Sequence, residues 1–226
     1  MKKIKYRIRY SKTGPARFTS HLDVIRALIR TIRRAGLPVA FSSGFNPKPQ
    51  LAFGPPLPLG VESEAEYFDL ELTVALSAEE VAQALKQNLP PGLDVLTVHQ
   101  LAPKAPSLMA QVTSIDYRFI LSRKTPWSDN QVAEWFGALW SRSELPVTKK
   151  TPTGEKKVDL RPLWHDYKLD FQNDGLISFR VQVAFGPGGT IRPDDFGSLL
   201  AAAFQIEEIR RTAVTFKDGE RRQKVH

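Results

Sequence analysis

The sequence predicts an α+β protein built from two ferredoxin-like halves, each with the element order β-α-β-β-α-β packed into one compact protein. Patterns typical of strands and helices alternate in the first hundred residues, and the second half repeats much of that order. Two copies of this topology account for all 226 residues without a long unstructured loop. The apolar fraction of 42% is sufficient for cores of this size.

The first predicted domain covers residues 1–101 and begins with a strand and a helix. Apolar and basic residues alternate over 3–10, which is the two-residue period of a half-buried strand. Ser20 and Asp23 have the spacing of a helix-capping pair, and the helix after them is expected to stop at Gly36. The expected apolar stripe of this helix is Leu22, Ile25, Ile29 and Ile32.

The rest of the first domain is predicted to contain three more strands and one more helix. Residues 38–51 are expected to form a strand that enters a loop, and 68–74 alternate as a third strand. Ser77 and Glu80 form a capping box before a second helix. Residues 94–101 are then expected to close the domain as its fourth strand.

A linker and a second domain follow. Residues 102–114 contain two prolines and several small residues without a period, so they are predicted to connect the two domains. The second domain is predicted over 115–218, and the basic tail 219–226 is expected to fray.

The second domain differs from the first by a polar insertion. Ser128 is expected to cap its first helix, and the polar and basic stretch 145–162 is interpreted as an excursion outside the repeat. The triplet at 173–175, Asn-Asp-Gly, is a strong hairpin signal. The last helix is expected to run through Phe204, followed by a strand at 209–216.

Composition excludes several classes of chemistry. The chain has no cysteine, so it cannot supply disulfides, thiolate nucleophiles, zinc thiolates or iron–sulfur ligands. Its formal net charge of +8 favours polyanionic partners. Neither a signal peptide nor a membrane-spanning run is visible, so we expect a cytoplasmic protein without a membrane partner.

The stretch FSSGFNPKPQLAFGPPLPLG at 41–60, here called the proline-rich segment, is the part that packing alone explains least. Its five prolines hold the residues before them extended, and Gly44 suits a backbone turn with positive φ, so the segment is expected to be stiff. A stiff loop that carries Phe45, Asn46 and Lys48 is typical of a binding loop.

The binding site is predicted to combine this segment with the arginines of the preceding helix. Phe45 is the aromatic most suited to stack on a base or to anchor a partner. Arginines on a helix are more often a solvated face than a binding groove, but together with Lys48 they favour a binding surface. Arg192 follows a glycine-rich loop at 186–189, which is consistent with a phosphate cradle or with a simple turn. The predicted binding residues are Arg26, Arg30, Arg33, Ser42, Gly44, Phe45, Asn46, Lys48 and Arg192.

The basic face of the first strand has two interpretations. Lys5, Arg7 and Arg9 can form ion pairs with Asp69 and Glu71 across neighbouring strands, or they can contact phosphates. The sequence leaves both open.

His21 and Asp23 are the alternative catalytic residues. A histidine at a helix start can act as an acid or base, as in metal-independent endoribonucleases of the tandem ferredoxin-like class, but that argument is fold analogy alone. The competing interpretation gives both residues structural roles at the start of the helix. The four histidines lack the paired spacing of metal ligands, so no metal and no other cofactor is predicted.

One long run resembles the radical SAM-linked family, a former domain of unknown function, in its standalone form. The run is RFTSHLDVIRALIRTIRRAGLPVAFSSGFNPKPQLAFGPPLPLGVESEAEYFDLEL, supported by PKAPSL at 103–108, KKVDLRP at 156–162 and IRPDD at 191–195. The resemblance implies a separately encoded radical SAM protein as partner, in a context of RNA processing or ribosome maturation.

Together these observations predict a non-catalytic accessory protein that binds RNA or a ribonucleoprotein and acts with a separate radical SAM enzyme. Two alternatives stay open. One is a metal-independent endoribonuclease that uses His21, and the other is an adaptor that contacts proteins only.

Overall fold

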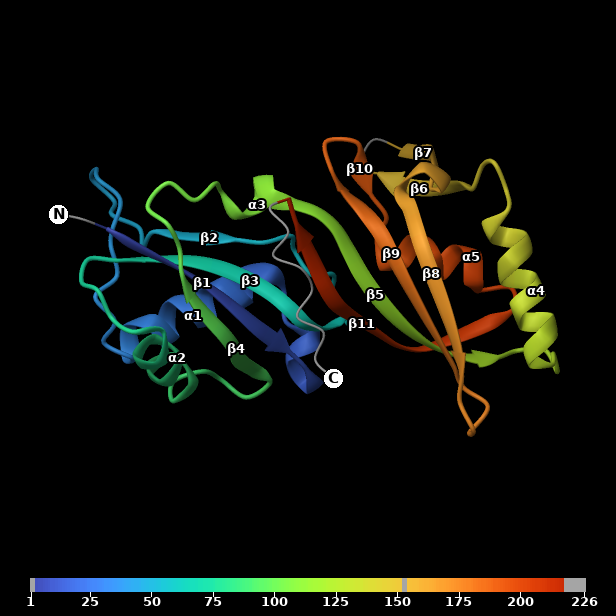
Figure 1. The fold of residues 1–226 in the computed structure, drawn as a ribbon, viewed down its shortest axis with the longest axis horizontal. Coiled ribbons are helices and arrows are strands. Elements are labelled where there is room, and N and C mark those ends of the chain that lie inside the picture. The colour runs from blue at the N-terminus through green and yellow to red at the C-terminus, as the bar shows by residue number, and fades with distance from the viewer. Residues whose placement is uncertain (1–2, 152–153, 218–226) are drawn as a thin grey trace. The chain divides into compact units, whose positions relative to one another are not determined.

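The computed structural model describes residues 3–151 and 154–217, with the backbone alone for 149–151 and 156. The predicted tail 219–226 lies outside the described residues. The chain is a mixed α+β protein that divides into two compact units, Met1–Val112 and Thr113–His226 (Figure 1). Each unit is described by itself.

Unit 1 is an antiparallel sheet with helices packed against one face. Its elements are β1 (Ile4–Lys12), η1 (Gly14–Phe18), α1 (His21–Arg34), β2 (Leu51–Phe53), β3 (Glu62–Leu72), α2 (Ala78–Lys86), β4 (Leu93–Gln100) and α3 (Leu108–Gln111). The strands lie in the order β2-β3-β1-β4. Residues from α1 and α2 share one buried cluster with Tyr6 and Ile8 of β1, so both helices cover the same face.

The predicted caps of unit 1 are confirmed, but the buried stripe of α1 is not the predicted one. Ser20 caps α1 by accepting the N–H of Asp23, and Ser77 and Glu80 form the expected capping box. Leu22 is 61% exposed. The buried apolar residues of α1 are Val24, Leu28 and Ile32. The helix carries more apolar residues than its core face accommodates, and packing selects among them.

The prediction of a strand over 38–51 is wrong. Only isolated bridges occur there, Val39 with Leu72 and Phe41 with Pro49, and β2 starts at Leu51. Prolines lack the N–H that a ladder requires, so regular pairing begins only after Pro49, the last proline before β2.

The predicted connection 102–114 contains ordered structure. It includes α3 and the first residues of β5, and Leu108 and Val112 are buried. Gln111 of α3 accepts a hydrogen bond from Arg7 of β1 (2.8 Å). The end of unit 1 is therefore tied to its own sheet.

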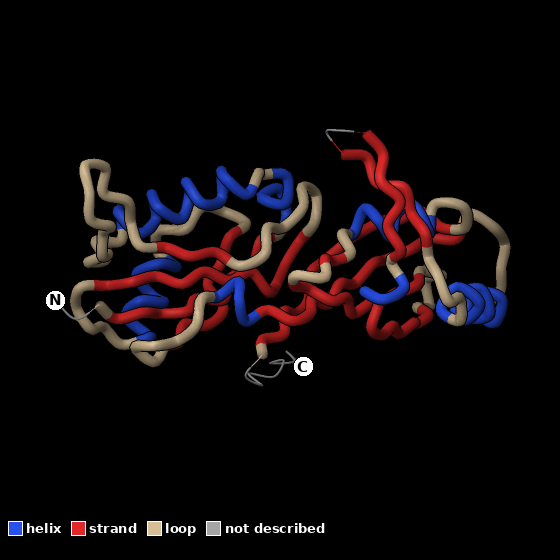
Figure 2. Tube along the Cα trace, turned by 90° about the horizontal axis from the view of Figure 1, so that it is seen from above, coloured by secondary structure: helices blue, strands red, loops and turns tan. Residues whose placement is uncertain are grey.

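Unit 2 has a central sheet and a separate hairpin. Its elements are β5 (Val112–Arg123), α4 (Asp129–Trp140), β6 (Pro146–Thr151), β7 (Gly154–Asp159), η2 (Arg161–Leu163), β8 (Trp164–Phe171), β9 (Ile177–Gly186), β10 (Gly189–Thr190), α5 (Pro193–Leu200) and β11 (Phe204–Phe216). β9, β5 and β11 lie side by side, and both β8 and β10 pair with β9. The pair β6-β7 is the predicted excursion and projects as a hairpin in Figure 2.

An aromatic core holds unit 2 together. The rings of Phe136 and Phe179 lie 4.8 Å apart, and Phe204 packs on Phe136 at 5.5 Å. The prediction that the last helix includes Phe204 is wrong, because α5 ends at Leu200 and Phe204 opens β11. Ser128 caps α4 and the hairpin over 173–175 joins β8 to β9, as expected.

The ion pair of Arg7 and Asp69 decides between the two interpretations of the basic strand. Arg7 donates from Nε to Asp69 Oδ1 (2.8 Å) and from Nη2 to Oδ2 (3.1 Å). Both side chains are buried, at 4% and 2% exposure. Lys5 also pairs with Glu71 (3.6 Å), and the buried Arg9 donates to the carbonyl of Glu64. Arg7 and Arg9 therefore have structural roles rather than phosphate contacts.

We expect Asp69→Ala to destabilise the protein by about 3–5 kcal/mol, because it leaves the Arg7 guanidinium buried without its carboxylate. The double variant Arg7→Met, Asp69→Leu should lose much less, since neither charge remains. Urea unfolding measures both. Lys5→Ala, which breaks a partly exposed pair, should cost no more than about 1 kcal/mol. Equal losses in the single and double variants would contradict a role for charge pairing.

Candidate functional site

Backbone hydrogen bonds fix the chain to β3 at Ala40 and Gln50, here called the two limbs of the proline-rich segment. The N–H of Ala40 donates to the carbonyl of Glu71 (2.8 Å), and the N–H of Glu71 donates to Gln50 (3.1 Å). The limbs also bond to each other, since the N–H of Gln50 donates to Ala40 (2.8 Å). The sheet therefore holds both ends of the intervening loop.

Residues 42–48 form the loop between these limbs, here called the tip hairpin. The N–H of Ser42 donates to the carbonyl of Lys48 (2.9 Å), and the N–H of Lys48 donates to Ser42 Oγ (3.0 Å). Gly44 has φ +123°, so the prediction of a positive φ is confirmed. In Figure 1 the tip hairpin is the blue loop that projects beyond the ends of the strands.

Phe45 lies at the end of the tip hairpin with its side chain in solvent. Its exposure is 107% of the reference area, so no described residue covers the ring. Asn46 and Lys48 are exposed beside it. Within the described part of the chain, the backbone N–H groups of 43–46 form no hydrogen bond. The tip thus presents an aromatic ring, a side-chain amide, a cation and free backbone donors.

Three of the predicted arginines form a stripe along α1, which leads towards the tip hairpin. Arg26, Arg30 and Arg33 are exposed at positions i, i+4 and i+7 of one helix face. Arg26 bonds to Asp23 (3.2 Å). Arg30 and Arg33 have no ion-pair partner among the described residues. The two unpaired guanidiniums are therefore the stronger candidates for an external anion.

The start of α1 contacts the proline-rich segment at Phe53. The rings of His21 and Phe53 make an edge-to-face contact at 5.9 Å, and Phe53 stacks on the buried Phe68 at 5.9 Å. Asp23 accepts a hydrogen bond from Ser20 Oγ (2.6 Å), which holds the pKa of that carboxyl below its usual value, with a further contribution from Arg26. Both side chains therefore have contacts within unit 1, and the alternative catalytic role of His21 and Asp23 stays a prediction.

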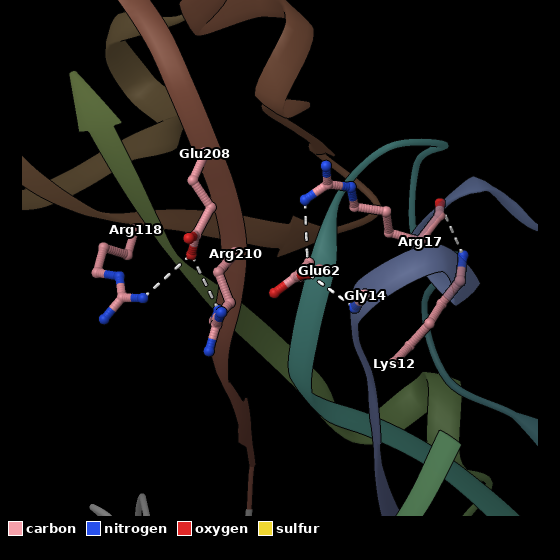
Figure 3. Close-up of polar contacts among 7 residues, drawn as sticks. All are labelled: Lys12, Gly14, Arg17, Glu62, Arg118, Glu208 and Arg210. Atoms are coloured by element: carbon pink, nitrogen blue, oxygen red, sulfur yellow. Dashed lines mark hydrogen bonds and ion pairs between the residues drawn. The ribbon is translucent and has the colours of Figure 1, made fainter. Parts of the chain in front are cut away.

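Sequence reasoning missed the polar contacts that position the start of α1. Lys12 is buried and donates from Nζ to the carbonyls of Thr19 (2.8 Å) and Arg17 (3.4 Å). Glu62 accepts the N–H of Gly14 (2.8 Å) and pairs with Arg17 (3.6 Å), as Figure 3 shows. The residue types gave no signal, because Lys12 bonds to backbone carbonyls and the partners of Glu62 lie more than forty residues away in the sequence.

Arg192 belongs to unit 2 and differs from the other predicted binding residues. It precedes α5, and its N–H donates to Asp195 Oδ2 (2.7 Å). Asp194 and Asp195 both lie in the first turn. Two carboxylates at a helix N-terminus oppose an additional anion, so local electrostatics do not favour a phosphate at this position.

Several other cations of unit 2 are paired. Glu208 accepts from Arg118 (3.2 Å) and from Arg210 (3.1 Å), as Figure 3 shows. Asp170 pairs with Arg180 and Lys168, and the Arg180 contact is the main cause that lowers the Asp170 pKa. Among the described residues, α1 thus carries two exposed arginines without ion-pair partners, whereas these cations on the sheet of unit 2 are paired.

Among the described residues, no group of three or more histidine, aspartate or glutamate side chains is placed to hold a metal ion. In the same residues, no helix is long and apolar enough to cross a membrane.

The fold and the site define an α+β protein with a projecting, partly aromatic loop. The chain matches a family of uncharacterized proteins conserved in bacteria (DUF2344) over residues 5–193, and it belongs to that family. This agrees with the former domain of unknown function that the sequence resembles, while the radical SAM link stays a prediction. No curated protein matches the chain.

One similar solved structure is a chain in the crystal structure of a Cbf5-Nop10-Gar1 complex. The TM-score is 0.52 at 11% identity, over 92% of this chain and 48% of that chain. This protein therefore spans about half the length of the solved chain, and at this identity the likeness concerns the fold alone.

We expect Ser20→Ala to raise the pKa of Asp23 towards 3.8, because the hydroxyl that stabilises the charged carboxylate is lost. NMR titration of the Asp23 side chain measures the shift. The lowered pKa means that this contact stabilises the fold above pH 3.8 and loses its effect as pH falls through the folded value. An unchanged Asp23 pKa in Ser20→Ala would contradict the assignment.

Proposed function

We propose that this chain is a non-catalytic accessory protein that binds RNA or a ribonucleoprotein surface through the tip hairpin and the arginine stripe of α1. It would act with a separate radical SAM enzyme in the modification or processing of RNA or of a ribosomal component. The observation that carries the proposal is the complete exposure of Phe45 on a loop held by the sheet, beside Asn46 and Lys48.

The charge arrangement supports an anionic ligand. Arg30 and Arg33 lie three residues apart on α1 without carboxylate partners in the described residues, and like charges at this spacing repel each other. An external phosphate would relieve that repulsion. Cations that track a backbone, combined with an aromatic ring for a base, are typical of proteins that bind single-stranded nucleic acid.

The partner enzyme is inferred from the resemblance of the sequence and from its composition. The cluster that cleaves S-adenosylmethionine is held by cysteine thiolates, and this chain has no cysteine. The radical chemistry would therefore lie outside these 226 residues. We infer from the resemblance that a separately encoded protein supplies it. We place both proteins in the cytoplasm, as the sequence predicts.

We also infer that both units are ferredoxin-like. In support, unit 1 has the order β1-α1-β2-β3-α2-β4 and the sheet β2-β3-β1-β4. Unit 2 has the equivalent order β5-α4-β8-β9-α5-β11 and the sheet β8-β9-β5-β11, if β6, β7 and β10 are insertions.

The two alternative functions, an endoribonuclease and a protein adaptor, predict different experimental results. An endoribonuclease would require His21 to act on a substrate. Its ring contact with Phe53, and the bonds of Asp23 to Ser20 and Arg26, are consistent with the structural alternative. Incubation with structured RNAs in EDTA tests for His21-dependent cleavage. A protein adaptor would show no RNA affinity at any salt concentration.

We expect Arg30→Gln, Arg33→Gln to weaken RNA binding and to flatten its salt dependence. Four cations, the three stripe arginines and Lys48, predict a slope of log affinity against log salt of about −2.8 for single strands. Loss of two of these cations should reduce the magnitude of the slope by about 1.4. Fluorescence anisotropy at several salt concentrations measures both slopes.

The matched control is Lys86→Gln, Lys104→Gln, which removes the same charge from exposed positions on α2 and after β4. It should leave the slope nearly unchanged. If both double variants weaken binding equally, the interaction depends on net charge and the assigned surface is wrong.

A further inference from the structure

The tip hairpin offers a single aromatic ring at the end of a narrow loop. Phe45 is fully exposed, and the strand-like limbs below it are closed by the hydrogen bonds between Ser42 and Lys48. A base inside a duplex already has neighbours on both of its faces. A lone ring of this kind therefore stacks on a base only where that base has left its own stack.

The groups beside Phe45 match the rest of a nucleotide. The exposed Asn46 amide has both a donor and an acceptor, as the hydrogen-bonding edge of a base does. The N–H groups of 43–46, unbonded in the described chain, and the Lys48 ammonium are donors suited to phosphate oxygens. A ring, an amide and cationic donors thus occur within six residues.

The spacing of the arginine stripe agrees with one nucleic-acid strand. At a rise of about 1.5 Å per residue, Arg26 and Arg33 are separated by about 10.5 Å along the axis of α1. One strand of duplex DNA advances about 3.4 Å per nucleotide, so three nucleotides stacked in that way span about 10 Å. The stripe can therefore follow the phosphates of one strand.

We infer that the tip hairpin binds an unstacked base of a single-stranded RNA segment, with Phe45 stacking on the base and Asn46 bonding to its edge. This inference rests on the proposed RNA-binding function and names the form of RNA that the site selects. Duplex RNA offers phosphates to the stripe but no free base to Phe45, so it binds more weakly.

The experiment compares the affinity of the full chain for one labelled RNA in two forms. The probe is a fluorescein-labelled strand of about 12 nucleotides, within the site sizes of single-strand binders, either alone or annealed to its complement. Anisotropy at about 50 mM salt gives both dissociation constants. We expect Phe45→Ala to weaken single-strand binding about 5- to 140-fold, from about 1–3 kcal/mol of stacking, and to change duplex binding less than twofold.

Two further variants separate stacking from simple apolar contact. Phe45→Tyr keeps an aromatic ring and should retain most of the affinity, whereas Phe45→Leu keeps apolar surface but loses the ring and should behave like Phe45→Ala. Phe18→Ala is the matched control, because Phe18 is 62% exposed and precedes α1 at the end away from the tip hairpin. It should bind like the unchanged protein. Circular dichroism verifies that each variant is folded.

Abasic probes test the contact directly. Removing the base that stacks on Phe45 should weaken binding by the unchanged protein but not by Phe45→Ala, because the two changes remove the same contact. A scan of single abasic positions identifies that base. Additive losses at every position would overturn the assignment.

The experiment distinguishes a failure of this inference from a failure of the proposed function. Equal affinity for single strand and duplex, with Phe45→Ala unaffected, overturns this inference and the role of Phe45, and leaves only the part of the proposed function that rests on RNA binding by the arginine stripe. No binding of either form overturns both. If Phe45→Ala leaves RNA affinity unchanged but abolishes recovery of a protein from nuclease-treated extract, Phe45 is a protein anchor and the inference is wrong.

Discussion

The backbone hydrogen bonds that attach Ala40, Gln50 and Glu71 to one another are the constraint on which the candidate site depends. They hold both limbs of the proline-rich segment on β3, so the loop between them has fixed ends. A polar loop of this size without such bonds would sample many conformations, and ordering it on binding would cost free energy. Because hydrogen bonds already hold both ends of the loop, binding through Phe45 would require little further ordering of the chain.

The positive charge of the chain is divided between structural and available groups. Arg7 is buried against Asp69, and Arg118 and Arg210 share Glu208. A net charge of +8 therefore says little about where an anion binds. The distribution points to α1, where Arg30 and Arg33 have no ion-pair partner in the described chain. A cation that is buried against a carboxylate holds neighbouring strands together. An exposed cation without a carboxylate partner remains available to a ligand.

Much of the candidate site followed from local sequence chemistry. The positive φ of Gly44 and the exposure of Phe45 were both expected from the turn around SGFNP. The contacts of Lys12 and Glu62 that hold the start of α1 were not foreseen, because the partners are backbone groups or are distant in sequence. The i, i+3 pair of Asp23 and Arg26 was not foreseen either, although its spacing on one helix was visible in the sequence.

The sequence by itself determined the starts of α1, α2 and α4 and the hairpin at 173–175, because caps and turns are properties of a few adjacent residues. Only the tertiary structure decided that Leu22 is exposed while Leu28 is buried, that β2 begins as late as Leu51, and that Arg7 is an internal ion pair. These outcomes depend on which surface packs against each residue, and no local pattern records that surface.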